Sequence, residues 1–446
     1  MNNRPKKIAI IGAGLVGSLM AIYLKKRGYD VAIYERRPDM RKGNVAAGRS
    51  INLALSNRGW KPLVEVGLES EVEKMVIPMK GRMMHDLRGN LTFQSYGKED
   101  EAINSISRGG LNQLLIEQAE KVGVTTHFEH KCLDVDYETS EATLDHNGLV
   151  VKVTADIIIG ADGAYSAVRQ VLQKTDRFNY NQHYIEHGYK ELCIPAGSAS
   201  SFLIEKNALH IWPRGNYMLI ALPNTDGSFT CTLFFPFDGE KSFSTLNDDE
   251  SVLEFFKEVF PDVVELMPTL LEDYYANPTS SLMTIKCYPW VKNKTVLIGD
   301  ASHAIVPFYG QGMNSGFEDC RVLNDLLNEY NDDWDIVLPL FQESRKPDAD
   351  AILDLALQNF IEMRDLVADE KFLVRKKIEA KLNELYPDKW IPLYSMVTFN
   401  ENMRYSEAIA RGAKQKSIMD KVMAKDGVLE NWEQLDLAEI IEEVSR

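Results

Sequence analysis

The sequence predicts an α/β fold that combines a nucleotide-binding domain, a β-rich second domain and a C-terminal helical region. Three observations predict it. A glycine-rich turn joins a strand to a helix at the start of the chain, and two further strand–turn–helix segments lie at residues 155–169 and 295–320. Between these two segments, apolar residues alternate as they do in sheet strands. Strands that alternate with helices are typical of a parallel sheet covered by helices.

Length, composition and charge narrow the classes of protein. The chain has 446 residues, which allows two or three domains, and its 45% hydrophobic and 26% charged residues are ordinary for a globular protein. The net charge of -16 disfavours binding to nucleic acid or to an anionic membrane. A small anionic substrate would therefore need a local basic group.

The five cysteines are scattered through the chain and form no close pair. This pattern argues against a disulfide framework and against a zinc site, so we expect no metal and a reducing cytoplasm. No apolar run approaches the ~18 residues of a membrane span, and the glycine-broken segment after the basic start MNNRPKK is unlike a signal peptide. We expect a soluble cytoplasmic protein.

The first glycine motif lies in "KKIAIIGAGLVGSLMAIYLKKRGYDVAIYER". A β-branched run precedes Gly12, Gly14 and Gly17, and an amphipathic helix and a second strand follow, which is the context that G-x-G-x-x-G requires. Gly12 is expected to make the turn, Gly14 to admit a pyrophosphate and Gly17 to let helix and strand pack closely. Glu35 ends the second strand, where a carboxylate accepts from ribose hydroxyls and repels a 2′-phosphate. NADP is disfavoured in this site, and FAD and NAD both remain.

The segment "ADIIIGADGAYSAVR" is the second motif. It predicts a buried strand at residues 157–159, a sharp turn in which Gly160 and Gly163 bracket Asp162, and a helix that begins at residues 166–169. Glycine beside Asp162 would let backbone approach a ligand. Taken alone, the segment fits an ordinary strand–turn–helix connection equally well.

The segment "TVLIGDASHAIVPFYGQGMNSGFEDC" is the third motif. It predicts a buried strand at residues 296–298 that ends in Gly299 and Asp300, then a loop with two glycines, then a helix starting near Asn314. An Asp in this position can accept from a polyol hydroxyl. A helix start can hold an anion or an electron-rich ring edge, and the glycines let a flat ring lie against backbone.

Together the three segments resemble the flavin-dependent aromatic hydroxylases, whose pattern is G-x-G-x-x-G, then D-G, then G-D followed by P-x-x-G-x-G. The resemblance implies FAD as the cofactor. It assigns Glu35 to the ribose of the adenosine, Asp300 to the ribityl chain, and the segment around Asp162 to the support of both FAD and NAD(P)H. The other cofactor contacts that it implies are Gly12, Gly14, Gly17, Arg108, Gly310, Gly312, Met313 and Asn314.

Further segments resemble those members of the family that act on an aromatic amino acid, L-kynurenine. The resemblance extends from about residue 6 to about residue 412. It is carried by "GRSINLALSNRGW", "PMKGRMMH", "HGYKEL", "LHIWPRG", "FTCTLF", "QNFIEMR" and "IPLYSMVTF".

An amino-acid substrate needs a partner for its carboxylate, and a bidentate Arg with hydroxyl or amide donors suits that group best. The resemblance assigns this role to Arg82, Tyr96, Asn359 and Tyr394. From the residue types alone, a surface ion pair, a core tyrosine and a solvent-facing asparagine are the commoner roles of such residues. The ring end should be apolar to exclude water. The candidates that the resemblance gives there are Leu203, Leu209, His210, Met218, Phe229, Phe308 and Met363.

The reaction that the resemblance implies uses NADPH and O2 to hydroxylate L-kynurenine to 3-hydroxykynurenine through a flavin hydroperoxide, a step of tryptophan catabolism. The amino group of the substrate activates its own ring, so we assign no protein acid or base, and His303 is expected to make a structural hydrogen bond. The alternatives are a hydroxylase of another aromatic acid, a flavoprotein that inserts no oxygen, and a dinucleotide-binding interaction module.

The expected organisation is discontinuous. The C-terminal region is predicted to be helical from residue 335, with Ile352, Leu355, Leu357 and Ile361 near one face. Its tail, residues 413–446, is expected to be a surface helix or a partly disordered end, without the membrane anchor that membrane-bound relatives carry there. The predicted parts are an FAD-binding domain (1–75, 100–177 and 285–330), a substrate domain (76–99 and 178–284) and a C-terminal helical region (331–446).

Overall fold

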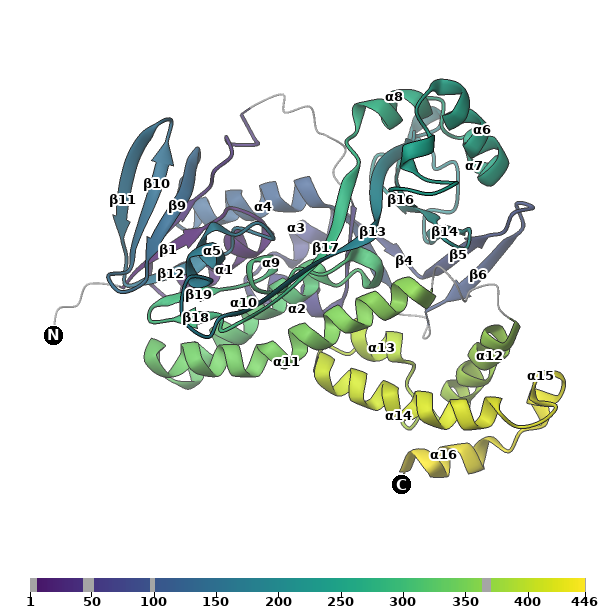
Figure 1. The fold of residues 1–446 in the computed structure, drawn as a ribbon. Helices are drawn as coiled ribbons and strands as arrows, with labels where there is room; N and C mark the ends of the chain where they lie inside the picture. The colour runs from purple at the N-terminus through teal and green to yellow at the C-terminus, as the bar shows by residue number, and fades with distance from the viewer. Residues whose placement is uncertain (1–5, 43–51, 97–100, 363–369, 446) are drawn as a thin grey trace.

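The computed structural model describes residues 6–42, 52–96, 101–362 and 370–445. Figure 1 shows two large sheets side by side, with the long helix α11 (Trp334–Ile361) running beneath both and the last helices packed below its C-terminal half. The long strands β13 (Asn179–Ile194) and β17 (Ser280–Tyr288) extend from one sheet toward the other.

The first large sheet has six strands in the order β18-β19-β12-β1-β2-β8, all parallel except the pair β18 and β19. Its central strands are runs of Ile, Val and Ala with almost no exposed surface, as expected for a parallel sheet covered on both faces. The strands are β1 (Lys7–Ile11), β2 (Asp30–Tyr34), β8 (Thr125–His127), β12 (Ile157–Gly160), β18 (Val291–Lys292) and β19 (Thr295–Leu297). The buried strands predicted at residues 157–159 and 296–298 are therefore confirmed as β12 and β19.

Helices and two small sheets surround the six-stranded sheet. One small sheet is the antiparallel meander β9 (His130–Asp136), β10 (Glu141–His146) and β11 (Leu149–Thr154). The other joins β3 (Asn52–Leu55), β7 (Ile103–Ser107) and β4 (Val76–Met79). The helices are α1 (Leu15–Lys26), α2 (Asn57–Glu65), α3 (Glu69–Glu73), α4 (Arg108–Lys121), α5 (Ala167–Leu172), α9 (Asp300–His303) and α10 (Gly312–Glu329).

The second large sheet has seven strands in the order β17-β13-β16-β15-β14-β5-β6. Its outer face packs against α6 (Asp249–Val259), α7 (Pro261–Val264) and α8 (Leu270–Ala276). Its inner face packs against α11 and the helices that follow it. The predicted alternating strands are confirmed, with "PNTDGS" as the turn between two of them. The remaining strands are β5 (Gly81–His85), β6 (Leu91–Ser95), β14 (Leu209–Pro213), β15 (Met218–Pro223) and β16 (Phe229–Pro236).

The C-terminal region is helical, as predicted, but the four apolar residues predicted near one face of its first helix do not all share that face. Ile352 and Leu355 are buried, whereas Ile361 is 50% exposed. A helix turns about 100° per residue, so Ile361 lies on the opposite side from Ile352. Helix α10 also begins two residues before the predicted Asn314. The helices after α11 are α12 (Glu370–Leu385), α13 (Leu393–Thr398), α14 (Tyr405–Met423), α15 (Val428–Asn431) and α16 (Leu437–Ser445).

The tail is a packed part of the fold rather than a partly disordered end. In α16, Ile440 and Ile441 are 4% and 2% exposed and belong to one apolar cluster with residues of α12 and α14. An amphipathic helix of this kind is held by the burial of its apolar face. Among the helices that the structure describes, none is both long enough and apolar enough to cross a membrane.

Candidate active site

The turn between β1 and α1 depends on two glycines. Gly12 has a φ of +108°, and a Cβ placed on it would lie 2.5 Å from the carbonyl oxygen of Ala161. A Cβ on Gly17 would lie 2.1 Å from the carbonyl oxygen of Gly12. No L side chain fits at either position, so the chain can pass tightly from strand to helix only with glycine. This matches the steric roles that the sequence predicts for both residues.

A cavity of about 380 Å³ opens at the N-terminus of α1. It is lined by Gly14, Glu35 and Arg108 among others, and no atom lies within 4 Å of a Cβ placed on Gly14. Helix α1 begins there without a side-chain cap and without an acidic residue in its first turn. Its free N–H groups and the positive end of its dipole therefore suit a phosphate.

Glu35 lies at the wall of this cavity as an ionised acceptor. Its carboxylate accepts from the Ala13 N–H at 2.9 Å and from the Arg37 N–H and Nε at 3.0 and 2.8 Å. Burial raises the pKa of Glu35, but the bonds from Arg37 and Ala13 outweigh burial and leave the pKa below its ordinary value. A fixed carboxylate beside a phosphate-binding turn suits the hydroxyls of a ribose.

The G-D segment follows β19, which is separated from β1 by the single strand β12 in the six-stranded sheet. Asp300 begins α9 and remains exposed to solvent. Surrounding protein nevertheless desolvates it enough to raise its pKa, and the charge of Arg108 counters that rise. A carboxylate that solvent can reach, and whose pKa is nevertheless raised by desolvation, is a candidate for contact with a bound ligand. Arg108 connects the two parts of the proposed FAD site, because its charge acts on Asp300 and its side chain also lines the cavity at the start of α1.

The glycine loop before α10 is fixed by the side chain of Asn314, which is fully buried. Its Nδ2 donates to the carbonyls of Ala54 and Gly310, both at 2.8 Å, and its Oδ1 accepts from the Ser56 N–H at 3.0 Å. The amide of Asn314 is thus committed to protein. A flavin ring here would instead meet the backbone of residues 310–313, where α10 begins without a side-chain cap.

The D-G turn after β12 is closed by its own side chain. Asp162 accepts from the Ala167 N–H at 2.7 Å through Oδ2, at the start of α5. Its Oδ1 is buried and has no hydrogen-bond partner among the described residues. Burial raises the pKa of Asp162. The ordinary role of a helix cap accounts for one oxygen of this carboxylate, and the role toward FAD and NAD(P)H stays a prediction.

Three of the four predicted carboxylate-binding residues meet in space. The guanidinium carbon of Arg82 (β5) lies 4.6 Å from the ring centre of Tyr394 (α13) and 5.8 Å from that of Tyr96. The two tyrosine rings are stacked, with centres 5.4 Å apart. Within the described residues, Arg82 forms no ion pair. Its Nε and the Tyr96 hydroxyl are both buried without a hydrogen-bond partner there, which is costly unless a ligand engages them.

Asn359 joins this group from α11 through the flavin loop. Its Nδ2 donates to the carbonyl of Phe308 at 2.6 Å, and the next residue, Tyr309, stacks on Tyr394 with ring centres 5.3 Å apart. The loop that would hold the flavin and the group that would hold a carboxylate are therefore in direct contact. Tyr309 was not among the predicted residues, although it lies within the motif; only its stacking on Tyr394 distinguishes it.

Comparison with known proteins decides the family. Residues 6–355 match the family described as FAD binding domain. The chain is 52% identical over 431 residues to the kynurenine 3-monooxygenase of Flavobacterium johnsoniae, covering 96% of both chains. It is 50% identical over 441 residues to that of Christiangramia forsetii, covering 98% of both. The chain belongs to the kynurenine 3-monooxygenase family. It is a flavin-dependent aromatic monooxygenase with FAD as its cofactor.

Solved structures support the fold of this kynurenine 3-monooxygenase family member. A tetrameric form of 2-methyl-3-hydroxypyridine-5-carboxylic acid oxygenase superposes with a TM-score of 0.68 at 20% identity. The match covers 82% of this chain and 94% of the other. At this identity the likeness is one of architecture.

The apolar candidates for the ring end divide between the two faces of the seven-stranded sheet. Leu209, Met218 and Phe308 belong to one cluster on the inner face, beside Tyr394. His210 and Phe229 point to the outer face, where His210 bonds to His85 at 2.8 Å, and Leu203 is 43% exposed. The expectation is wrong for His210 and Phe229, because neighbouring residues of a strand face opposite sides, and Leu203 lies in a loop outside both faces. Met363 lies outside the described residues.

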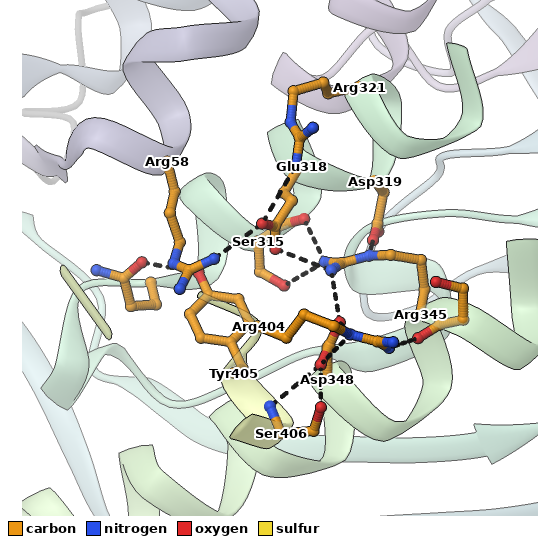
Figure 2. A network of polar contacts seen from close by, with 12 residues as sticks. Arg58, Ser315, Glu318, Asp319, Arg321, Arg345, Asp348, Arg404, Tyr405 and Ser406 are labelled. Carbon is orange, nitrogen blue, oxygen red and sulfur yellow. Dashed lines mark hydrogen bonds and ion pairs between the residues drawn. The ribbon is translucent and has the colours of Figure 1, made fainter. Parts of the chain in front are cut away.

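Behind the flavin loop, a network of buried charges connects α2, α10, α11 and α14 (Figure 2). Glu318 pairs with Arg58 at 2.9 Å and with Arg345 at 2.8 Å. Arg345 also pairs with Asp319 at 2.8 Å. The His303 imidazole bonds to Asp319 at 2.6 Å, so its predicted structural role is confirmed. Asp319 further accepts from the Gly299 N–H at 2.9 Å and so holds the residue before Asp300.

The charge of Asp319 should make stability depend on pH. Burial raises its pKa, but His303 and Arg345 outweigh burial and hold the pKa at about 2, below the ordinary 3.8. A lowered folded-state pKa contributes roughly 2 kcal/mol above about pH 4, and this is lost as the pH falls toward 2. We expect the unfolding free energy of the wild type to fall more steeply below pH 4 than that of Asp319→Asn, measured by denaturant titration. Parallel curves would contradict this.

Proposed function

We propose that this chain catalyses the hydroxylation of L-kynurenine to 3-hydroxykynurenine, with NADPH and O2 consumed and NADP+ and water released. The observation that carries the proposal is the partly buried group Arg82, Tyr96 and Tyr394 beside the flavin loop, in which two buried donors have no hydrogen-bond partner among the described residues. Family membership supplies the reaction. NADPH rather than NADH, and the cytoplasm as the compartment, are parts of the same proposal. None of the five cysteines is in a disulfide, which supports a reducing compartment.

In this proposal Arg82 binds the carboxylate of the substrate. The guanidinium can present two parallel N–H groups to the two oxygens, and the Tyr96 hydroxyl can add a third donor. Burial raises the pKa of Tyr96 well above its ordinary value, so this hydroxyl stays protonated and donates at neutral pH. Tyr394 supports the guanidinium with the face of its ring.

The aromatic end of the substrate would lie against the inner-face apolar cluster. Leu209, Met218 and Phe308 exclude water there. Bound FAD supplies hydride acceptance from NADPH and the activation of oxygen. Asn359 fixes the backbone of Phe308 and so fixes the loop between the carboxylate group and the flavin. The amino group of L-kynurenine activates its own ring, so no protein base is required.

The other site residues and the domain boundaries are proposed with the roles predicted from the sequence. The cavity at Gly14, Glu35 and Arg108 supports the adenosine and pyrophosphate of FAD. The exposure of Asp300 favours its assignment to the ribityl chain. The uncapped N-terminus of α10 at Gly312 favours the assignment of this backbone to the flavin ring.

One spectrum and one turnover assay test the proposal. We expect the purified protein to be yellow, to release FAD on denaturation, and to oxidise NADPH with O2 uptake only when L-kynurenine is added. The product should be heavier than the substrate by one oxygen atom. A colourless protein, or NADPH oxidation stimulated by a hydroxybenzoate but not by L-kynurenine, would refute it.

A further inference from the structure

The segment "SNRGW" at residues 56–60 lies in one of the stretches that carry the resemblance, and no ligand-binding role is assigned to its arginine. Its Arg58 is 1% exposed, which is unusual for an arginine. A buried guanidinium needs several acceptors. The positions of these acceptors show which elements Arg58 connects.

Most of the acceptors of Arg58 are the last carbonyls of helix α13 and of the loop after it. The Nε donates to Val397 at 2.8 Å, and one terminal nitrogen donates to Asn400 at 2.9 Å and to Met403. The neighbouring Asn57 donates to Phe399 at 3.1 Å. Carbonyls at a helix C-terminus lack intrahelical partners and carry the negative end of the dipole, so a cation there both satisfies and stabilises them.

The other terminal nitrogen of Arg58 connects to the flavin helix. It pairs with Glu318 on α10 at 2.9 Å, as Figure 2 shows. The next residue, Gly59, approaches α10 so closely that a Cβ on it would lie 2.3 Å from the Oδ1 of Asn314. Asn314 is the residue that fixes the glycine loop. One dipeptide of α2 therefore contacts the end of α13 and the start of α10 together.

Helix α14 provides a second connection between Arg58 and the glycine loop. The guanidinium of Arg58 lies 4.1 Å from the ring centre of Tyr405, and the Tyr405 hydroxyl donates to Gln311 in the glycine loop at 2.9 Å. Tyr394, whose ring supports Arg82, lies on α13 one turn before Val397. Arg58 thus links the helix that carries Tyr394 to the flavin loop, in addition to the direct stacking of Tyr309 on Tyr394.

We propose that Arg58 is a positioning residue of the hydroxylation: it fixes α13, which carries Tyr394, to α10, which begins at the flavin loop. This rests on the proposed function. The contact keeps the carboxylate group and the flavin at one distance, and a ring carbon must be placed closely for productive transfer. Arginine is required because lysine has a single nitrogen and cannot reach Glu318 and the carbonyls of α13 at once.

The test compares Arg58→Lys with Arg321→Gln as a matched control. Arg321 also pairs with Glu318, at 3.6 Å, but it caps no carbonyl of α13 in the described part of the chain. Five quantities are measured on the FAD-loaded proteins: bound FAD, amide hydrogen exchange at residues 393–403, KM, kcat, and 3-hydroxykynurenine formed per NADPH.

For Arg58→Lys we expect wild-type FAD content, faster exchange at residues 393–403, a KM for L-kynurenine raised roughly tenfold and less product per NADPH, with kcat for NADPH oxidation changed little. Arg321→Gln should match the wild type in all of these. Wild-type KM and coupling in Arg58→Lys would overturn the proposal, even if exchange became faster, because the residue would then be structural only.

Two further outcomes keep the test decisive. If Arg58→Lys does not accumulate as folded protein, Asn57→Ala replaces it, with the same directions expected at smaller size; wild-type values there would overturn the proposal. If the wild type itself does not hydroxylate L-kynurenine, the proposed function fails at that step. The positioning role in hydroxylation, which rests on that function, then fails with it, and faster exchange at residues 393–403 in Arg58→Lys would report a structural contact only.

Discussion

Replacing Arg82 with alanine is expected to raise the KM for L-kynurenine about a hundredfold while the purified protein keeps its FAD. Removing one partner of a buried, hydrogen-bonded charge pair costs about 2–5 kcal/mol, and roughly 2.7 kcal/mol is a hundredfold. The large effect follows from the surroundings of Arg82. Its Nε is buried beside two tyrosine rings, so truncation leaves the substrate carboxylate without this cation and its parallel N–H donors.

A matched control comes from the same hairpin. Arg88 is exposed at the turn between β5 and β6, so Arg88→Ala should leave KM unchanged. Arg82→Lys should lie between alanine and the wild type, because an ammonium cannot bind two carboxylate oxygens in parallel. Steady-state kinetics and the flavin absorbance of each protein measure both quantities. A wild-type KM in Arg82→Ala would remove this residue from the substrate site.

Replacing Glu35 with alanine is expected to weaken FAD binding tenfold to a hundredfold and to leave the KM for L-kynurenine unchanged in the flavin-loaded fraction. Hydrogen bonds to a charged group contribute about 1.5–3 kcal/mol. Glu35 also orders the turn, because it accepts from the Ala13 N–H next to Gly14. Its loss therefore removes a ligand contact and loosens the phosphate end of the cavity together.

Asp30 is the matched control for Glu35, since it is an exposed carboxylate at the other end of β2. Asp30→Ala should bind FAD like the wild type, and Glu35→Gln should fall between the two because it keeps one acceptor oxygen. Titration of the apoproteins with FAD, followed by flavin fluorescence, gives the dissociation constants. Equal affinity in Glu35→Ala and Asp30→Ala would contradict the ribose assignment.

The sequence predicted well what depends on local chemistry. The glycines at positions 12 and 17 are dictated by a backbone that passes too close to Ala161 and to itself for any side chain, and such constraints recur in every turn of this type. Buried parallel strands are visible as unbroken β-branched runs. The pattern around Asp300 was equally local, because its strand, turn and helix follow each other directly.

The sequence could not show which face of a strand or helix points toward the substrate site. Alternation along β14 shows that Leu209 and His210 point to opposite faces, but not which face carries the substrate. The helical pattern near Ile361 failed for a related reason, because several apolar stripes fit α11 and only packing selects one. Arg58 was invisible as a functional candidate, since its partners lie at the far end of the chain.

The distance along the chain between Arg58 and Val397, 339 residues, has a consequence for synthesis. Domains generally fold from the N-terminus as they leave the ribosome. Arg58 on α2 therefore cannot bond to its carbonyl acceptors at residues 397–403 until nearly the whole polypeptide has been synthesised. A nascent chain stopped before α13 would leave that charge without its carbonyl acceptors and would expose the apolar surface that α13 and α14 cover in the finished fold, and exposed apolar surface of this kind favours aggregation.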